Sequence, residues 1–360
     1  MKTEDETMLA SRMNKLTPYV PGEQPRDRRY LKLNTNENPY PPSPKIKSFL
    51  KTFDIENLRL YSDPQAMDLR RRLAERYRCS EDCVFVSNGS DEALSFCFYA
   101  FFDSDRGPLL FPEFTYSFYP VYCDFYQIAF EKTPLDREFG VDLKAFLDRP
   151  SCGVIFANPN APTGRYIPPA AIRSFMERYP RDRVVLVDEA YIDFGGESAV
   201  GLLDDFPNLV VVRTFSKSMS LAGLRLGFVI AREPLIASLF TVKDSFNSYP
   251  TDILSQKIGE IAVADTEYYR TINEKIVETR ETFVQRAGAL GCRVLPSKAN
   301  FVFASVPGTP GLSVYQGLKE RGILVRHFDK GGIRDFVRIT IGRPEDMERL
   351  AEEIRRLFFS

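Results

Sequence analysis

The stretch LVVVRTFSKSMSLAGLRLGFVI (residues 209–230) places a lysine, Lys217, just beyond a run of apolar residues. Serines flank this lysine, and Arg225 follows within the same stretch. A short, wholly apolar run before polar residues is typical of a strand buried in the core of a sheet. Burial disfavours the charged form of a lysine at the end of such a strand. Lys217 is therefore the first candidate for a chemical role.

Two further apolar runs resemble the run LVVV (209–212). They are GVIFA (153–157) and VVLV (184–187), and polar residues with Gly or Pro follow each run. The segment PPAAIRSFMERY (168–179) lies between these two and has the apolar spacing of a helix. Strands that are apolar throughout and alternate with helices predict a parallel sheet covered on both faces. We therefore expect an α/β fold with a large, doubly wound, mostly parallel sheet.

The remaining chain suggests an arm before this sheet and a smaller body after it. The first forty residues are rich in Pro and Asn, which favours an extended segment. Beyond a long helical pattern at 265–288, the segments NFVFASV (300–306) and FVRITIG (336–342) indicate a second α/β unit. We expect the arm to pack on the small domain or on a partner subunit. The predicted parts are an N-terminal arm (1–35), a large domain (36–255) and a small C-terminal domain (256–360).

Composition narrows the class of protein. The 360 residues carry a net charge of −1, which gives no electrostatic footprint for nucleic acid. The polar, acidic start of the sequence is not a secretory signal, and the longest apolar run is about half a membrane span. Six cysteines without a CxxC pair favour free thiols in the cytoplasm. The one histidine, His327, excludes a multi-histidine metal site, so we expect no metal. From the short apolar runs we expect no membrane partner.

Polar residues follow each predicted strand, and the carboxyl ends of parallel strands are where ligands bind. One ligand, pyridoxal 5'-phosphate, accounts for all of them. Its aldehyde needs an amine, which Lys217 supplies, and its ring nitrogen needs a buried carboxylate such as Asp188. Tyr191 can donate to its phenolic oxygen. An arginine, hydroxyls and helix N-terminal amides suit its phosphate; the candidates are Gly89, Ser90, Asp91, Thr214, Ser216 and Arg225.

Each of these features has a simpler explanation when taken alone. A lysine at a strand end is commonly a solvated residue at the rim of a sheet. The sequence DEAY (188–191) can form a turn before a helix. The sequence GSDE (89–92) can be a helix N-terminus with favourable acidic residues. The order of the whole set, each member at a strand end, is what indicates a cofactor site.

The segments TFSKSMSLAGLRLG, VDEAYIDF, NPNAPTG and NGSDEAL resemble the fold-type I pyridoxal-phosphate aminotransferases, and most closely the histidinol-phosphate aminotransferase family. The resemblance covers nearly the whole chain. It implies that Lys217 forms a Schiff base with the cofactor and moves the proton of the substrate. It also implies a homodimer in which Tyr61 reaches the phosphate of the neighbouring site. Tyr116 is expected to stack on the cofactor ring, with Phe114 as the alternative.

One position departs from the family pattern. Members often carry PNNPTG, in which the second Asn contacts the phenolic oxygen, whereas here that position is Ala161. Either Asn160 takes over this contact or Tyr191 serves alone. The departure suggests a divergent subgroup.

The substrate end is expected in the small domain. By resemblance, Arg326 and Arg338 bind the anionic group of the substrate, since arginine suits bidentate capture, and Tyr19 from the arm adds a contact. Arg338 could instead form an ion pair at a strand edge. His327 is expected to be exposed or structural.

The resemblance implies a cytoplasmic, dimeric enzyme that exchanges amino groups between histidinol phosphate and 2-oxoglutarate in histidine biosynthesis. Two enzymes on the same fold remain as alternatives, an aromatic amino-acid aminotransferase and a threonine-phosphate decarboxylase. A non-catalytic regulator that binds pyridoxal phosphate is the alternative from another class.

Overall fold

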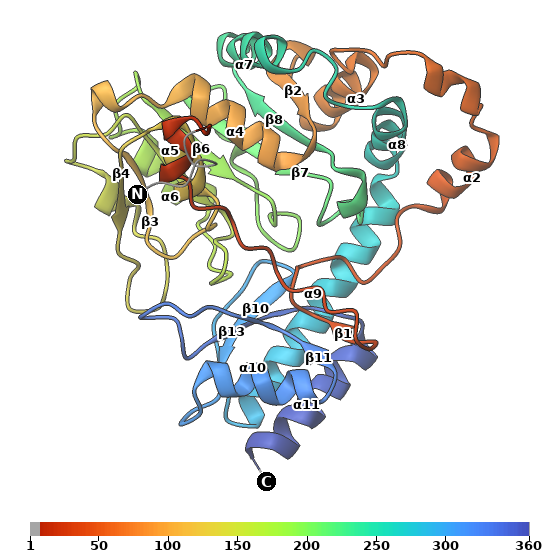
Figure 1. Cartoon of the computed structure of the whole chain (residues 1–360), viewed down its shortest axis with the longest axis vertical. Helices are drawn as coiled ribbons and strands as arrows, with labels where there is room; N and C mark the ends of the chain where they lie inside the picture. Colours follow the sequence, from red (N-terminus) through yellow and green to blue (C-terminus); the bar gives the residue numbers. More distant parts are fainter. Residues whose placement is uncertain (1–7, 360) are drawn as a thin grey trace.

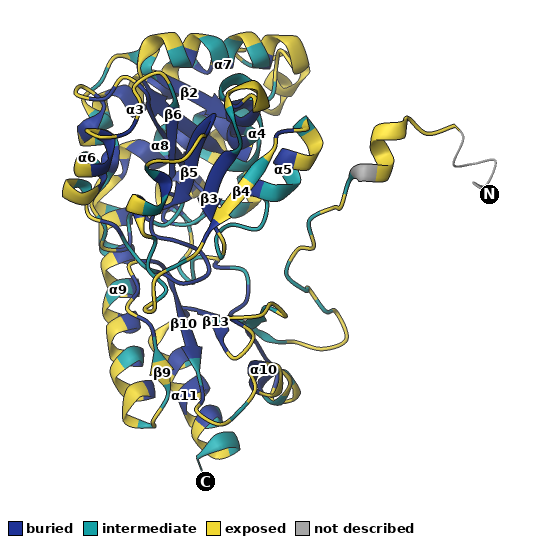
Figure 2. Cartoon of the chain, turned by 90° about the vertical axis from the view of Figure 1, so that its left-hand side faces the viewer, coloured by how far each residue is buried: buried dark blue, intermediate teal, exposed yellow. Residues whose placement is uncertain are grey.

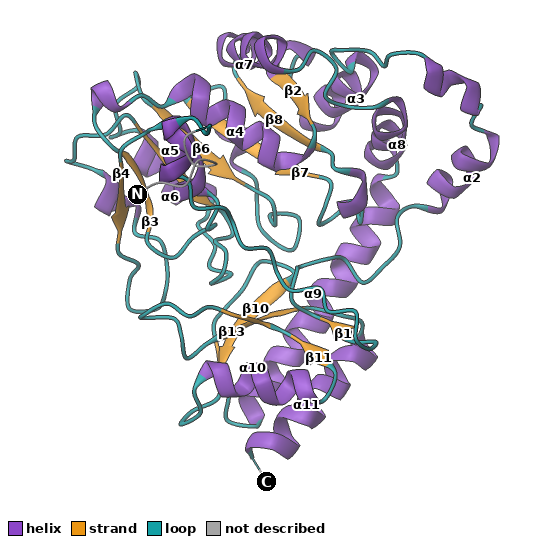
Figure 3. Cartoon of the chain, viewed as in Figure 1, coloured by secondary structure: helices purple, strands orange, loops and turns teal. Residues whose placement is uncertain are grey.

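The computed structural model describes residues 8–359, which form two bodies joined by a long helix (Figure 1). The larger body contains a seven-stranded sheet, and the smaller body contains a four-stranded antiparallel sheet (Figure 3). The joining helix is α9 (Thr266–Ala289). No helix within residues 8–359 combines the length and apolarity needed to cross a membrane.

The larger sheet has the strand order β2-β8-β7-β6-β5-β3-β4. Only β8 runs antiparallel to its neighbours, β2 and β7. The three apolar runs found in the sequence are β5, β6 and β7, which pair side by side in parallel. This confirms the predicted mostly parallel sheet. The strands are β2 (Val84–Ser87), β3 (Leu109–Pro112), β4 (Phe130–Thr133), β5 (Gly153–Ala157), β6 (Val184–Asp188), β7 (Leu209–Thr214) and β8 (Gly227–Ala231).

Both faces of the larger sheet are covered, as Figure 2 shows by the buried central strands. Along β6, Val185 and Val187 join one apolar cluster, while Val184 and Leu186 join the other. Alternate side chains of a strand point to opposite faces, so a strand apolar throughout requires cover on both. The helices of this body are α2 (Pro44–Thr52), α3 (Met67–Tyr77), α4 (Gly89–Phe101), α5 (Tyr119–Tyr126), α6 (Pro169–Met176), α7 (Glu233–Phe246) and α8 (Ile253–Ala264).

The smaller body packs helices on one antiparallel sheet, ordered β12-β13-β10-β9. Its last helix begins at a proline, and Asp346 accepts the backbone N–H of Arg343 to cap the first turn. Its buried residues, Met347, Leu350 and Ile354, recur at helical spacing. The elements are β9 (Arg293–Val294), β10 (Phe301–Ser305), α10 (Gly311–Glu320), β11 (Ile323–Leu324), β12 (Arg326–His327), β13 (Val337–Thr340) and α11 (Pro344–Phe358).

The N-terminal segment is fixed to the smaller body through a short parallel pair. Strand β1 (Leu31–Lys32) lies beside β11, and the N–H of Leu31 donates to the carbonyl of Gly322 at 2.8 Å. Further back, the ring of Tyr19 lies against Phe118 of the larger body, with ring centroids 5.0 Å apart. The segment therefore touches both bodies. Residues 1–7 of the predicted arm lie outside the described residues.

The domain division stays a proposal, and packing favours a later boundary than residue 256. That boundary falls within α8, which packs on α3 of the larger body. Ile258 and Ala262 of α8 belong to the apolar cluster of that body. We propose that the change from large to small domain lies within α9.

Candidate active site

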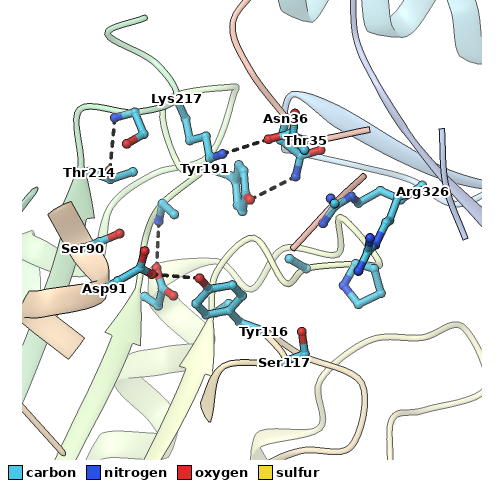
Figure 4. Close-up of a pocket in the computed structure, with 18 of the residues that line it drawn as sticks. Thr35, Asn36, Ser90, Asp91, Tyr116, Ser117, Tyr191, Thr214, Lys217 and Arg326 are labelled. Carbon is cyan, nitrogen blue, oxygen red and sulfur yellow. Dashed lines mark hydrogen bonds between the residues drawn. The ribbon is translucent and has the colours of Figure 1, made fainter. Parts of the chain in front are cut away.

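A cavity of about 240 Å³ lies between the carboxyl ends of the larger sheet, the N-terminal segment and the smaller sheet (Figure 4). It gathers residues from distant parts of the chain at the place where ligands bind on parallel sheets. Twelve of the predicted site residues line it. They are Tyr19, Ser90, Asp91, Tyr116, Asp188, Tyr191, Thr214, Ser216, Lys217, Arg225, Arg326 and Arg338.

Lys217 enters the cavity from the turn that follows β7. Its Nζ donates to the carbonyl of Thr35 at 3.2 Å and lies 5.7 Å from the ring centroid of Tyr191. Within residues 8–359, no carboxylate forms a salt bridge with this amine. A half-buried amine without an acidic partner is suited to react with a carbonyl compound.

Asp188 ends β6 and is 5 % exposed at the wall of the same cavity. Its Oδ2 accepts the hydroxyl proton of Tyr119 at 2.9 Å, and Oδ1 accepts the N–H of Ala190 at 3.1 Å. Burial raises the pKa of Asp188 to about 6, although these two hydrogen bonds favour the ionised form. A buried carboxylate of this kind gains stability from a cation brought into the cavity.

Tyr191 stands between the two bodies. Its ring packs edge-on against Phe301 of β10, with centroids 5.0 Å apart, and its oxygen accepts Nδ2 of Asn36 at 3.0 Å. Figure 4 shows Tyr191 beside Lys217. The hydroxyl group is therefore held in place while its ring lines the cavity.

An anion-binding corner lies at the N-terminus of α4. Ser90 and Asp91 occupy the first turn of this helix, whose free N–H groups attract negative charge. The guanidinium of Arg225 joins the corner through Ser216 Oγ at 3.4 Å and Asp91 Oδ2 at 3.1 Å. Gly89 does not line the cavity itself, but a Cβ at this position would lie 2.6 Å from Nη2 of Arg225. Glycine is needed there for the arginine to approach the helix.

Of the two candidates for ring stacking, only Tyr116 lines the cavity. Its hydroxyl donates to Asp91 Oδ1 at 2.8 Å, and its ring meets Tyr119 edge-on at 5.6 Å. Phe114 instead packs against the cluster around Leu295 and Phe303. The geometry therefore favours Tyr116 for this role.

At the opposite end of the cavity, Arg326 and Arg338 occupy facing positions on the paired strands β12 and β13. Neither forms a salt bridge with a carboxylate in the described part of the chain. Burial lowers the pKa of Arg338, and the nearby Arg326 lowers it further. Arg326 donates to the carbonyls of Val20 and Pro21, each at 3.2 Å. Two uncompensated like charges side by side create a site for an anion.

Two predicted residues lie away from the cavity. Asn160 is fully buried, and its Nδ2 donates to the Phe114 carbonyl at 2.8 Å and to Thr163 Oγ1 at 3.1 Å. The structure therefore gives no support to Asn160 as a replacement for an asparagine at position 161. Tyr61 is 83 % exposed and stacks on Tyr249, so it contributes nothing to the cavity of its own chain.

The sequence did not predict the contribution of Asn34, Thr35 and Asn36, which all line the cavity. The carbonyl of Asn34 accepts Nη2 of Arg338 at 3.0 Å, and Asn36 has a left-handed φ of 57°. Asparagine tolerates this conformation better than most residues. The only signal in the sequence was an Asn-rich segment, which pattern analysis treats as an irregular loop.

Comparison with known proteins identifies the family. The family model described as aminotransferase class I and II matches residues 28–354. The chain belongs to this family. It is therefore an aminotransferase, and pyridoxal 5'-phosphate is its cofactor, as the sequence predicted. Among the residues described, no group of His, Cys, Asp and Glu side chains is arranged to hold a metal ion.

Two kinds of relative agree with this membership. The chain is 57 % identical to the histidinol-phosphate aminotransferase of Syntrophus aciditrophicus (strain SB), covering 99 % of this chain and 100 % of the relative. The structure of the histidinol-phosphate aminotransferase from Clostridium acetobutylicum superposes with a TM-score of 0.83 at 22 % identity, covering 91 % and 99 % of the two chains. That from Sinorhizobium meliloti, in complex with pyridoxal-5'-phosphate, gives a TM-score of 0.81 at 23 % identity, covering 92 % of each chain. The fold-type I prediction is confirmed.

Proposed function

We propose that this aminotransferase exchanges amino groups between histidinol phosphate and 2-oxoglutarate, in histidine biosynthesis. The facing arginines, Arg326 and Arg338, carry this proposal. They form a second anion-binding end of the cavity, separate from the corner at Ser90 and Arg225. A phosphorylated amine needs such a second end, because the first is suited to the phosphate of the cofactor.

The residues present fit pyridoxal phosphate. Lys217 offers an amine without an acidic partner, and Asp188 offers a carboxylate whose pKa is raised to about 6 by burial and which a charged ring nitrogen would stabilise in its ionised form. The glycine at position 89 lets the guanidinium of Arg225 lie against the first turn of α4, where the arginine and the helix N-terminus can hold an anion together. When bound, the cofactor supplies an aldehyde for the amine and a ring that draws electrons from the substrate.

The side chains then have distinct tasks. Asp188 would keep a proton on the ring nitrogen of the bound cofactor, because the ionised carboxylate stabilises that positive charge. Nζ of Lys217 would take the proton from the α-carbon of the substrate and return it to the carbon that carries the cofactor's aldehyde, on the other side of the transferred nitrogen. Arg326 and Arg338 hold the phosphate of the substrate. Tyr116 packs beside the cofactor ring, while Tyr19 closes the cavity from the N-terminal segment.

We also propose a homodimer in which Tyr61 completes the neighbouring phosphate corner. Ile55, Tyr61 and Phe246 are 74 %, 83 % and 77 % exposed, which is unusual for large apolar side chains outside an interface. Tyr61 meets Tyr249 at 4.5 Å, so the segment 55–61 is continuous with the α7–α8 connection. In Figure 1 this segment, together with α2, projects from the larger body.

Mixing two inactive variants tests this arrangement. If Tyr61 acts in the partner's site, a heterodimer of Lys217→Ala and Tyr61→Ala has one site with both defects and one site with none. Activity should reappear after the two proteins are unfolded and refolded together. No recovery, with heterodimers present by mass spectrometry, would show that Tyr61 serves its own chain.

We place the enzyme in the cytoplasm, consistent with its free cysteines.

The substrate is tested by comparing three amino donors on the purified protein saturated with pyridoxal phosphate. Histidinol phosphate, phenylalanine and threonine phosphate would each be supplied with 2-oxoglutarate. We expect kcat/KM to be highest for histidinol phosphate. A preference for phenylalanine would replace the substrate assignment, and release of carbon dioxide from threonine phosphate would replace the reaction type.

A further inference from the structure

Asn36 is the only described side chain that hydrogen-bonds the oxygen of Tyr191. It is 1 % exposed and hydrogen-bonds Tyr191, which follows β6 of the larger body, and Thr340 on β13 of the smaller body. Figure 4 shows the contact of Asn36 with Tyr191 next to that of Thr35 with Lys217. One short segment thus contacts both the reactive amine and the tyrosine beside it.

The orientation of the Asn36 amide is set by Thr340 of β13. The backbone N–H of Asn36 donates to Thr340 Oγ1 at 2.9 Å, and this hydroxyl donates its own proton to Asn36 Oδ1 at 3.0 Å. The amide oxygen therefore faces Thr340, and its NH₂ group faces Tyr191. Asn300 Nδ2 also donates to the backbone carbonyl of Asn36 at 3.0 Å.

This orientation determines what the Tyr191 hydroxyl can do. Nδ2 of Asn36 carries only donor hydrogens, so the oxygen of Tyr191 must accept at that side. The proton of Tyr191 is then free to point away from Asn36. Because Tyr191 lines the cavity, that proton is available to a negatively charged oxygen of a bound ligand.

The need for such a donor is greater here because Ala161 lines the cavity without any polar group. Asn160 has both its donor contacts elsewhere, at Phe114 and Thr163. We propose that Asn36 is a positioning residue that makes Tyr191 a hydrogen-bond donor to the phenolic oxygen of the cofactor. This proposal rests on the proposed function, because it concerns the same cofactor site.

The test is a pH titration of the visible absorption band of the bound cofactor. A donor from Tyr191 stabilises the ionised phenolic oxygen, so it lowers the pKa of the proton that this oxygen shares with the Lys217 nitrogen. Asn36→Asp is the decisive variant, since a carboxylate accepts the proton of Tyr191 and withdraws it from the cavity. We expect the pKa of the band to rise by about 1 unit, a shift typical of one such hydrogen bond.

Matched variants separate this role from a structural one. Asn36→Gly removes the side chain yet tolerates the left-handed backbone, and it should give a smaller rise than Asn36→Asp. Tyr191→Phe should give a rise at least as large, and the Tyr191→Phe/Asn36→Asp double variant should add nothing to it. Thr340→Val should raise the pKa, whereas Thr340→Ser should leave it unchanged. Thermal melting of each apoprotein reports any loss of folding.

The outcomes are distinguishable from failure of the proposed function. If wild-type protein with pyridoxal phosphate shows no visible band, or if borohydride does not fix the cofactor on Lys217, the proposed function fails. If the wild-type band titrates and Tyr191→Phe shifts it, but folded Asn36→Asp does not, the role of Asn36 is overturned. An equal additional shift in the double variant would also overturn it, because Asn36 would then act independently of Tyr191.

Discussion

The two ends of the cavity hold their charged side chains in different ways. At the end formed by the larger sheet, Arg225 and Asp188 each have a side-chain partner, whereas the amine of Lys217 contacts a backbone carbonyl. Arg225 pairs with Asp91 at 3.1 Å, and Asp188 accepts a hydrogen bond from the hydroxyl of Tyr119. At the end formed by the smaller sheet, the side chains of Arg326 and Arg338 hydrogen-bond only backbone carbonyls among the described residues. Their guanidinium groups also lie over the rings of Phe301 and Phe328.

This difference indicates which end is permanent and which is exchangeable. A cofactor that stays bound can be held by a corner whose charges are already organised. A substrate must enter and leave in each cycle, and an arginine held only by neutral backbone carbonyls keeps its charge available to an incoming anion, whereas Arg225 already faces the carboxylate of Asp91. Arg338 and Arg326 are thus available to an incoming anion, and the N-terminal segment that supplies the carbonyls lies beside them.

We call the end of the cavity formed by the larger sheet the first end, and the end formed by the smaller sheet the second end. The strongest test of the first end is Lys217→Ala. Removing the amine eliminates the base at the α-carbon, so we expect a loss of kcat of about 10⁴-fold, the upper range for general acid–base catalysis. Steady-state assays with histidinol phosphate would measure it. Lys257→Ala is the matched control, because that lysine pairs with Asp68 and Glu260 away from the cavity. Residual activity within tenfold of wild type would remove Lys217 from the chemistry.

The second end is tested by Arg338→Gln, which keeps a donor but removes the charge. Charge-assisted hydrogen bonds are worth about 1.5–3 kcal/mol each, so we expect kcat/KM for histidinol phosphate to fall by roughly 10–100-fold. The cofactor affinity should stay the same, since Arg338 lies at the opposite end from Arg225. A fall of equal size with phenylalanine would show that Arg338 binds anionic groups in general, such as the carboxylate of that amino acid, rather than the phosphate in particular.

The contrast between the two ends also explains what the sequence could predict. Asp188, Lys217 and Ser90 each lie at or just beyond the end of an apolar strand. Recognising these strands from their apolar runs therefore places the three residues at the same edge of the sheet. The roles of Arg326 and Arg338 came only from family resemblance. Strand β12, which carries Arg326, is two residues long and gives no periodic signal, and the apolar run around Arg338 indicates a strand but not a ligand. Asn36 gave no signal beyond its Asn-rich segment, since its partners Tyr191 and Thr340 are far away in the chain. The strand β8 was not predicted, and its apolar run would not by itself have revealed that it runs antiparallel.

The pH dependence of cofactor binding tests the first end more finely. Below pH 6 Asp188 takes up a proton, because burial raises its pKa to about 6, and it can no longer balance the charged ring. The dissociation constant of pyridoxal phosphate should then rise by up to about tenfold per pH unit. Asp188→Asn should bind weakly with a flatter profile, retaining only the titration of the cofactor phosphate. Parallel profiles for the two proteins would show that Asp188 is not the group that titrates.

The smallest effect is expected where the N-terminal segment is fastened near the second end. Glu23 accepts hydrogen bonds from Lys319 Nζ at 2.6 Å and from the hydroxyl of Tyr315, both on α10. This partly exposed pair is worth about 0.2–1 kcal/mol, so Glu23→Gln should raise KM for histidinol phosphate by roughly 1.4–5-fold. Added salt should reduce the difference in KM between wild type and Glu23→Gln, since exposed charges are screened. Glu267→Gln, in a pair with Arg270 on α9, is the matched control. If Glu23→Gln changed kcat but not KM, the segment would govern a later step than substrate capture, and the second end would not be the exchangeable one.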